Sequence, residues 1–314
     1  MRPGAGSGRA VSLTLISAFV LGTAAGCGDP FRSVSELDET PQVLAVRAEP
    51  PELGPGEEVT LDALVHWPGG QPLLFWLVCI PNIGESFTTC LQNQFGQLAE
   101  PPSCQAEPGA RFCVAGVGPS ATYRVPQGVF PDDGETHTFF VNMLATSGVE
   151  GLEGCAETLS GGAPSEDCLL SLKRVVVTYS DGRNVNPLVS HMTLDGSALA
   201  PGQAALVEQA GAGTDDLAFE IGVALDPASV DELFPQGEPP LEFTLVVSWF
   251  TDCGRLGVES SFLACWPEVD GGGPGCETPE VRWKPGSSGL CSVHAVVRDG
   301  RGGTGFLTQE FEIR

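Results

Sequence analysis

The cysteines constrain this chain more than any other feature. Eleven cysteines occur in 314 residues, and Cys27 stands apart from the rest near the N-terminus. The other ten divide into six in the first half and four in the second, namely Cys79, Cys90, Cys104, Cys113, Cys155 and Cys168, then Cys253, Cys265, Cys276 and Cys291. Because both numbers are even, each half can close its own disulfides without a leftover thiol.

The spacing of these cysteines argues against thiolate metal sites. No C-x-x-C occurs, so zinc-ribbon, haem-attachment and thioredoxin-like motifs lack their defining pair. The pattern predicts a disulfide framework in an exported protein. Many pairings are possible, and the connectivity stays open at this point. We favour Cys155–Cys168, which would close a glycine-rich loop, and expect the other bridges to stay within their own half.

The first 26 residues have the three parts of a secretory signal. Arg2 and Arg9 are its charges, an apolar run follows from Ala10 to Leu21, and small residues lead to Cys27. An apolar run of 12 residues is too short to cross a hydrocarbon core of about 30 Å. The sequence therefore predicts a signal peptide over residues 1–26 and export of the remainder.

Four residues at the end of this signal, Ala24-Ala25-Gly26-Cys27, resemble the bacterial lipobox. The resemblance implies that the Cys27 sulfur carries a diacylglycerol and that acyl chains such as palmitate anchor the mature protein. The alternative is an ordinary secretory signal that leaves Cys27 as a free thiol. Gly28 stands where this family has Asp for inner-membrane retention, so the resemblance implies an outer-membrane destination.

The mature chain is strongly acidic. Without the signal, 13 Lys and Arg remain against 40 Asp and Glu, a net charge of −27, and Lys173 and Lys284 are the only lysines. General electrostatics therefore disfavours nucleic acid as a partner. We expect the chain to meet the membrane only through its lipid, and an envelope protein or a glycan to be its other partner.

Short apolar runs that alternate with polar residues predict an all-β chain. In Glu58–His66, the residues Val59, Leu61, Ala63 and Val65 share one face of a strand. The predicted strands are Val43–Ala48, Glu58–His66, Leu73–Val78, Thr138–Leu144, Leu172–Tyr179 and Phe306–Ile313.

The second half repeats the first. Twelve-residue steps from Val43 to Pro55 and from Val189 to Pro201 each lead to a glycine and an alternating run. These runs are Val59–Ala63 and Ala204–Val207, and each half then places a tryptophan, Trp76 or Trp249, shortly before a cysteine. Both halves also end with a polar glycine turn, Tyr179–Gly182 and Arg298–Gly303. We expect a tether over 27–42 and two copies of one β-module over 43–184 and 185–314.

Three segments carry a resemblance to known β-modules. Pro55–Leu61 is similar to the second-strand entry of bacterial Ig-like domains. Val297–Gly303 and Asp132–Phe139 are similar to the two ends of the penultimate strand in PKD-like repeats. The resemblance implies two tandem Ig-like β-sandwich domains and carries over no catalytic residues.

Three long loops depart from a minimal module. They are Ile80–Phe112, Gly151–Asp167 and Asp226–Pro240, and we expect one helical turn at Val230–Phe234 in the third. Long loops are usually functional, disordered or cross-linked. Loops stapled by disulfides are candidates for a recognition surface, and the alternative is variable decoration without a role.

The sequence shows no catalytic motif. It lacks G-x-S-x-G, H-E-x-x-H and phosphate-binding glycine loops, and its histidines, His66, His137, His191 and His294, lie on different predicted strands. Acidic turns at Asp132, Asp133, Glu135, Asp215 and Asp216 are read as structural, with calcium as the alternative. Trp266 beside Cys265 is read as packing on a disulfide, with carbohydrate stacking as the alternative.

These observations predict a non-enzymatic binding or structural module without a cofactor. The alternatives are an adhesin that binds carbohydrate or protein through the cysteine-rich loops, and an accessory subunit of an envelope hydrolase.

Overall fold

The computed structural model describes residues 35–82, 85–86, 89–90, 101–148, 151, 154–155, 167–208, 218–226, 245–263, 265–266, 275–276 and 280–314. Its elements are twenty β-strands, which confirms the predicted all-β class. The predicted signal peptide, Cys27, the pair Asp215 and Asp216, and the helical turn at Val230–Phe234 lie outside the described residues. Within the described residues, no helix is long and apolar enough to span a membrane.

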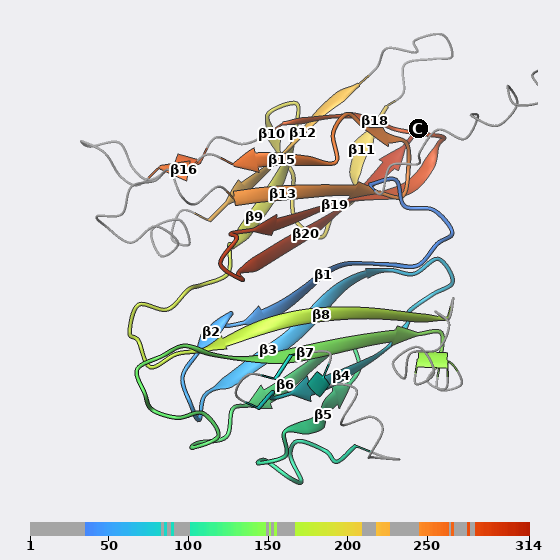
Figure 1. Ribbon diagram of the computed structural model, residues 1–314. Helices are drawn as coiled ribbons and strands as arrows, with labels where there is room; N and C mark the ends of the chain where they lie inside the picture. Colours follow the sequence, from blue (N-terminus) through green and yellow to red (C-terminus); the bar gives the residue numbers. More distant parts are fainter. Residues whose placement is uncertain are drawn as a thin grey trace, which may run out of the picture. The chain divides into compact units, whose positions relative to one another are not determined.

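The first sandwich packs a three-stranded sheet on a five-stranded sheet (Figure 1). The smaller sheet has the order β1-β3-β6, with bounds Gln42–Glu49, Glu58–His66 and Ser120–Arg124. The larger has the order β2-β8-β7-β4-β5, with bounds Glu52–Leu53, Cys168–Val177, His137–Thr146, Leu73–Cys79 and Phe112–Val117.

The second sandwich pairs two five-stranded sheets. One has the order β10-β9-β12-β18-β14, with bounds Ser197–Ala198, Val189–Leu194, Phe219–Leu225, Val281–Lys284 and Arg255–Leu256. The other has the order β11-β20-β19-β13-β15, with bounds Ala205–Val207, Thr304–Ile313, Gly289–Arg298, Leu245–Thr251 and Ser260–Leu263. A separate ribbon joins β16 (Cys265–Trp266) to β17 (Gly275–Cys276).

The two sandwiches share one topology. The order β2-β8-β7-β4-β5 matches β11-β20-β19-β13-β15, and β1-β3-β6 matches β9-β12-β18. The short strands β2 and β11 each run parallel to the last strand of their sandwich, whereas the other strand pairs are antiparallel. This sheet order, with short strands packed in two layers, is that of tandem Ig-like sandwiches.

The register of the repeat differs from the predicted one. The sequence step aligned Val59–Ala63 with Ala204–Val207, but the partner of β3 by topology is β12, and Ala205–Val207 corresponds to the short strand β2. The predicted step is wrong because the connection from β9 to β11 is longer and contains β10, whereas only Pro50 and Pro51 separate β1 from β2. The same step therefore ends before β3 in the first sandwich and before β11 in the second.

Two further boundaries differ from the prediction. Strand β8 begins at Cys168, not at Leu172, because its first half pairs with β7 as far as Thr146. The turn Arg298–Gly303 connects β19 to β20, whereas Tyr179–Gly182 follows the last strand of its sandwich. These two glycine turns are therefore not equivalent positions of the repeat.

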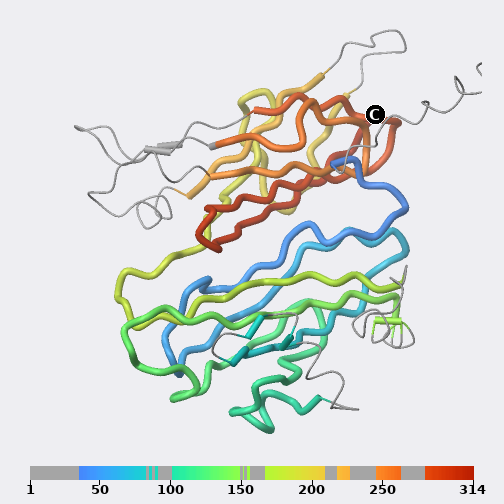
Figure 2. The backbone as a smooth tube through the Cα atoms, viewed as in Figure 1, coloured from blue at the N-terminus to red at the C-terminus, as the bar shows by residue number. Residues whose placement is uncertain are grey.

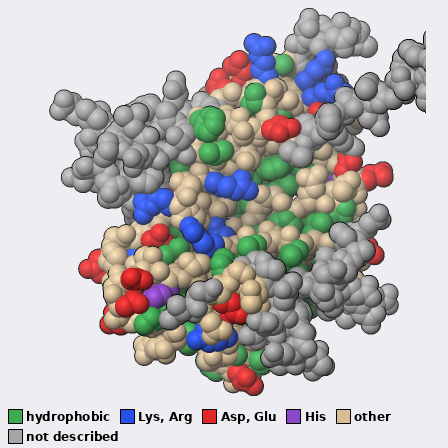
Figure 3. Space-filling view, in the orientation of Figure 1, with side chains coloured by type: hydrophobic (Ala, Val, Ile, Leu, Met, Phe, Trp, Pro, Cys, Tyr) green, Lys and Arg blue, Asp and Glu red, His purple; other side chains and the backbone are tan. Residues whose placement is uncertain are grey.

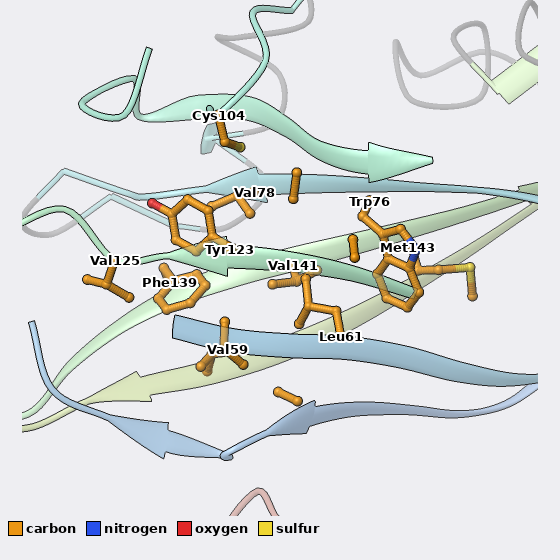
Figure 4. Close-up of a cluster of buried hydrophobic side chains, with 14 of the residues drawn as sticks. Val59, Leu61, Trp76, Val78, Cys104, Tyr123, Val125, Phe139, Val141 and Met143 are labelled. Atoms are coloured by element: carbon orange, nitrogen blue, oxygen red, sulfur yellow. The ribbon is translucent and has the colours of Figure 1, made fainter. Parts of the chain in front are cut away.

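Each sandwich has its own apolar core. In the first, Val59 and Leu61 of β3 face Phe139 and Val141 of β7, with Trp76 fully buried among them (Figure 4). The second core is built around Trp249 and Trp283, Trp283 packing on Phe311 with ring centroids 4.7 Å apart. Trp76 donates its indole N–H to the Gly118 carbonyl at 2.9 Å, and Trp249 donates its indole N–H to the Ser261 hydroxyl at 2.9 Å.

Candidate functional site

Disulfides staple one sheet of the first sandwich. Cys79 at the end of β4 bonds to Cys90, and Cys155 bonds to Cys168 at the start of β8. The Cys155–Cys168 bridge was predicted from the sequence, and this prediction is confirmed. Cys104 bonds to Cys113 of β5, and Cys104 also donates its backbone N–H to the Val114 carbonyl at 3.0 Å. The predicted disulfide framework is therefore confirmed in this half, with every described bridge inside the sandwich.

The outer face of this sheet has a second, small apolar cluster. Leu77, Phe112 and Leu144 pack there with the buried sulfurs of the Cys79–Cys90 and Cys155–Cys168 bridges. Asn142 of β7 lies opposite Leu77 and Leu172 in the strand register and is fully buried. Its amide oxygen and nitrogen find no hydrogen-bond partner in the described part of the chain. A buried amide in this state marks a site with unused polar capacity.

The second sandwich has one described bridge, from Cys253 after β13 to Cys291 of β19. Asp252 lies near these two sulfurs, but both sulfurs are committed to the disulfide and offer no thiolate to a metal. Cys265 and Cys276 stand opposite each other in the β16–β17 register. Trp266 is paired with Gly275 in the backbone of that ribbon, and its side chain lies outside the described part of the structure.

A cavity of about 440 Å³ opens beside the Cys104–Cys113 staple. Its lining includes Tyr123, Gln105 and Gln127, with Arg124 and Glu58 3.5 Å apart in an exposed ion pair. The Tyr123 hydroxyl is buried and has no partner among the described residues. Burial raises the pKa of this phenol, so it stays neutral and is an available hydrogen-bond donor.

In the predicted acidic turn, the Asp133 carboxylate already has a backbone N–H and a histidine as partners. The Asp133 carboxylate accepts the Glu135 N–H at 2.9 Å and lies 3.1 Å from the ring of His137. These contacts lower the pKa of Asp133, the backbone hydrogen bond most strongly. The arrangement is that of a turn stabilised by its aspartate, which is the structural reading of Asp132, Asp133 and Glu135.

Polar and apolar contacts join the two sandwiches at a junction. Both sandwiches belong to one compact unit that begins at Val34, and β1 lies beside β20 (Figure 2). Leu44 and Ala45 of β1 pack against Val296 of β19 in a shared apolar cluster. Arg47 of β1 lies over the Phe306 ring, 4.7 Å from its centroid.

The linker between the sandwiches is bonded to both of them. The Asn186 amide donates to the Ala48 carbonyl at 2.7 Å and the Glu49 carboxylate at 2.6 Å, and it accepts the Thr304 N–H at 2.8 Å. The linker runs so close to β20 that a side chain at Gly305 would lie 1.9 Å from the Pro187 carbonyl. Only glycine allows this approach, so the linker is fixed in place.

Two cations complete the junction. Lys173 of β8 donates from Nζ to the Gly302 carbonyl at 2.5 Å and to the Thr304 hydroxyl at 3.0 Å. Arg298 of β19 donates to the Ser248 hydroxyl at 3.0 Å and to the Leu44 carbonyl at 2.9 Å. Sequence reasoning noted Lys173 only as one of two lysines. The one available signal was its inward position in the alternating strand Leu169–Val177.

The histidines are not brought together as ligands. His66 lies 2.7 Å from the Asp38 carbonyl, His191 bonds to Ser190, and His137 to the Asp133 turn. His294 is buried on the same face of β19 as Val296, with Nδ1 2.9 Å from the Thr308 hydroxyl. Burial, the largest cause, and the nearby His66 together lower the pKa of His294 to about 4, against the opposing effect of Asp252.

The sheet order and the staples define the class of this chain as a tandem Ig-like β-sandwich protein with disulfide-bonded loops. No protein-family model matches the sequence, and no curated protein matches it. Among solved structures, the chain is similar to dimeric latent PorU from Porphyromonas gingivalis, at 12% identity and a TM-score of 0.24. That match covers 88% of this chain and 24% of PorU.

Two further similarities are of the same order. The two tandem V-type regions of VCBP3, a v-region-containing chitin binding protein, match at 12% identity and a TM-score of 0.28, covering 86% of this chain and 100% of that one. Red sea bream transglutaminase matches at 11% identity and a TM-score of 0.23, covering 90% and 32%. A function for this chain is therefore argued from its own residues.

Proposed function

We propose that this chain is an exported, non-enzymatic lipoprotein of the cell envelope, anchored through Cys27, whose sandwiches form one binding or structural module. The observation that carries the proposal is the set of four disulfides, because such bonds persist in oxidising compartments outside the cytosol. The lipobox-like residues before Cys27 support lipid attachment, and Gly28 supports an outer-membrane destination.

The binding role is assigned to the stapled side of the first sandwich. On the outer face of the sheet β2-β8-β7-β4-β5, the Cys79–Cys90 and Cys155–Cys168 bridges pack in one apolar cluster, and the unpartnered Asn142 lies on the same sheet. Loops held by disulfides reduce the ordering cost of association. This surface favours the adhesin alternative, in which a glycan or an envelope protein is bound there, over an accessory role to a hydrolase.

Replacing Cys27 with alanine tests the anchor. We expect the C27A variant to move almost entirely from the membrane fraction to the soluble extracytoplasmic fraction. Its acyl chains, worth about 0.8 kcal/mol per buried CH₂, would be absent. Fractionation followed by immunoblotting measures this, with Gly28→Ala as the matched control that stays in the membrane. A wild-type protein found in the soluble fraction, or a C27A variant retained by membranes, would overturn the proposal.

A further inference from the structure

The junction contains a cleft with an excess of positive charge. The cleft has a volume of about 330 Å³, within the lower range of ligand pockets. Strand β1 contributes the apolar residues Val43–Val46, strand β8 contributes Ser171–Lys173, and the β19–β20 hairpin contributes Arg298, Gly300 and Gly302–Thr304. Figure 3 shows basic side chains on this face at the level where the sandwiches meet.

The cations of this cleft have only neutral partners. Lys173 is bonded to a carbonyl and a hydroxyl, and Arg298 to a hydroxyl and a carbonyl, with no ion pair to either among the described residues. Lysine has three N–H donors and arginine five, so both retain donors that these bonds do not use. Buried charges in proteins are normally paired, and an unpaired one calls for a counter-charge.

The Asp299 carboxylate, whose charge acts on Lys173, is already occupied. Asp299 accepts the Arg301 and Gly303 N–H groups at 2.8 Å each and the Asn184 amide at 2.6 Å. The charges of Arg298 and Arg174 also disfavour a proton on Lys173, and neutral donors already satisfy the Asp299 carboxylate that favours it. This local excess stands in a chain with a net charge of −25, where a basic cluster is not expected by composition.

We propose that the cleft lined by Lys173 and Arg298 binds a small oxyanion, a carboxylate or phosphate group, between the two sandwiches. An ammonium and a guanidinium give charge-assisted hydrogen bonds to such oxygens, and the apolar wall from β1 strengthens them by excluding water. The bound group would bridge β8 of one sandwich and β19 of the other. The oxyanion site includes neither the lipid anchor nor the disulfide-bonded loops, so its test is independent of the test of the proposed function.

Protonation of Lys173 links this site to pH. Burial, the largest cause, together with the charges of Arg298 and Arg174 lowers the pKa of Lys173 to about 8, against the opposing effect of Asp299. The ammonium is therefore the main form at pH 7 and is lost by pH 10. Because the charge of Lys173 is then absent, we expect the affinity for an oxyanion to fall about tenfold between these two values.

The presence of only two lysines allows a direct test. Full-length protein labelled with ¹³C at lysine Cε should give two NMR signals, one from Lys173 and one from the exposed Lys284. We expect inorganic phosphate or acetate, added at constant ionic strength and pH 7, to shift the Lys173 signal saturably and leave that of Lys284 unchanged. Saturation by one anion alone identifies the phosphate or the carboxylate as the preferred group.

Two variants control the experiment. Lys173→Met should lose the responding signal and the saturable stabilisation of the fold by the anion, whereas Lys284→Met should keep both. The measurement on the wild-type protein is decisive even if Lys173→Met fails to fold. A Lys173 signal that does not respond to either anion, or two signals that drift together without saturation, would overturn the proposal.

Discussion

Replacing Cys253 and Cys291 together with alanine is expected to lower the free energy of unfolding by about 4 kcal/mol. The two residues are 38 positions apart, the widest separation among the described bridges, and their bond joins the end of β13 to β19. The chain-entropy cost of closing a loop grows with its length, so this bridge restricts the unfolded chain the most. Alanine avoids placing a hydroxyl at the buried Cys291 position.

The matched control is the removal of Cys104 and Cys113, which are only 9 positions apart. The same relation gives about 2.5 kcal/mol for this shorter loop. Urea unfolding of both double variants and the wild type measures the difference. If the short bridge proves as stabilising as the long one, or if neither double variant changes the midpoint, the disulfide framework does not stabilise the fold as described.

Acidification is expected to destabilise the protein through His294. The pKa of this imidazole is about 4 in the folded state against 6.5 for the free side chain. Between these values the unfolded state binds more protons than the folded state, so stability falls as the pH falls. This stability is fully present above pH 6.5, and about 3 kcal/mol of it is lost by pH 4.

Comparison of two histidine variants isolates this effect from the titration of carboxylates. His294→Gln keeps a polar group beside Thr308 but does not titrate, so its unfolding free energy should depend less on pH than that of the wild type. His191→Gln, on the partly exposed strand β9, should behave as the wild type does. Urea unfolding at pH 7 and pH 4.5 checks both, and an equal acid loss in the wild type and His294→Gln would contradict the assignment.

Local patterns in the sequence were sufficient to predict the all-β class, several of the longer strands and the disulfide chemistry. The alternation Val59, Leu61, Ala63 and Val65 does place these residues at the first core. Strand patterns carry this information because side chains of one strand alternate between two faces. The same reasoning misplaced the repeat after Gly202, since the short strand β11 has too few residues to show a period.

The junction could not be predicted from sequence. Lys173 contacts Thr304 across 131 positions, and Asn186 contacts Glu49 across 137. The segment around each of these residues shows no pattern that singles the residue out. Its role depends on which parts of the two sandwiches meet in the folded protein. Tyr123 and Asn142 were missed for a related reason, because a missing hydrogen-bond partner is a property of the packed structure and not of the strand that carries the residue.

A fixed junction makes the two sandwiches unfold together, which calorimetry measures. We predict that the wild-type protein unfolds in one transition whose calorimetric and van't Hoff enthalpies agree. Asn186→Ala, which leaves the Thr304 N–H and the Glu49 carboxylate without their junction partner, should cost about 2 kcal/mol and broaden or divide that transition. Two separate transitions in the wild-type protein, unchanged by Asn186→Ala, would show that the sandwiches are independent.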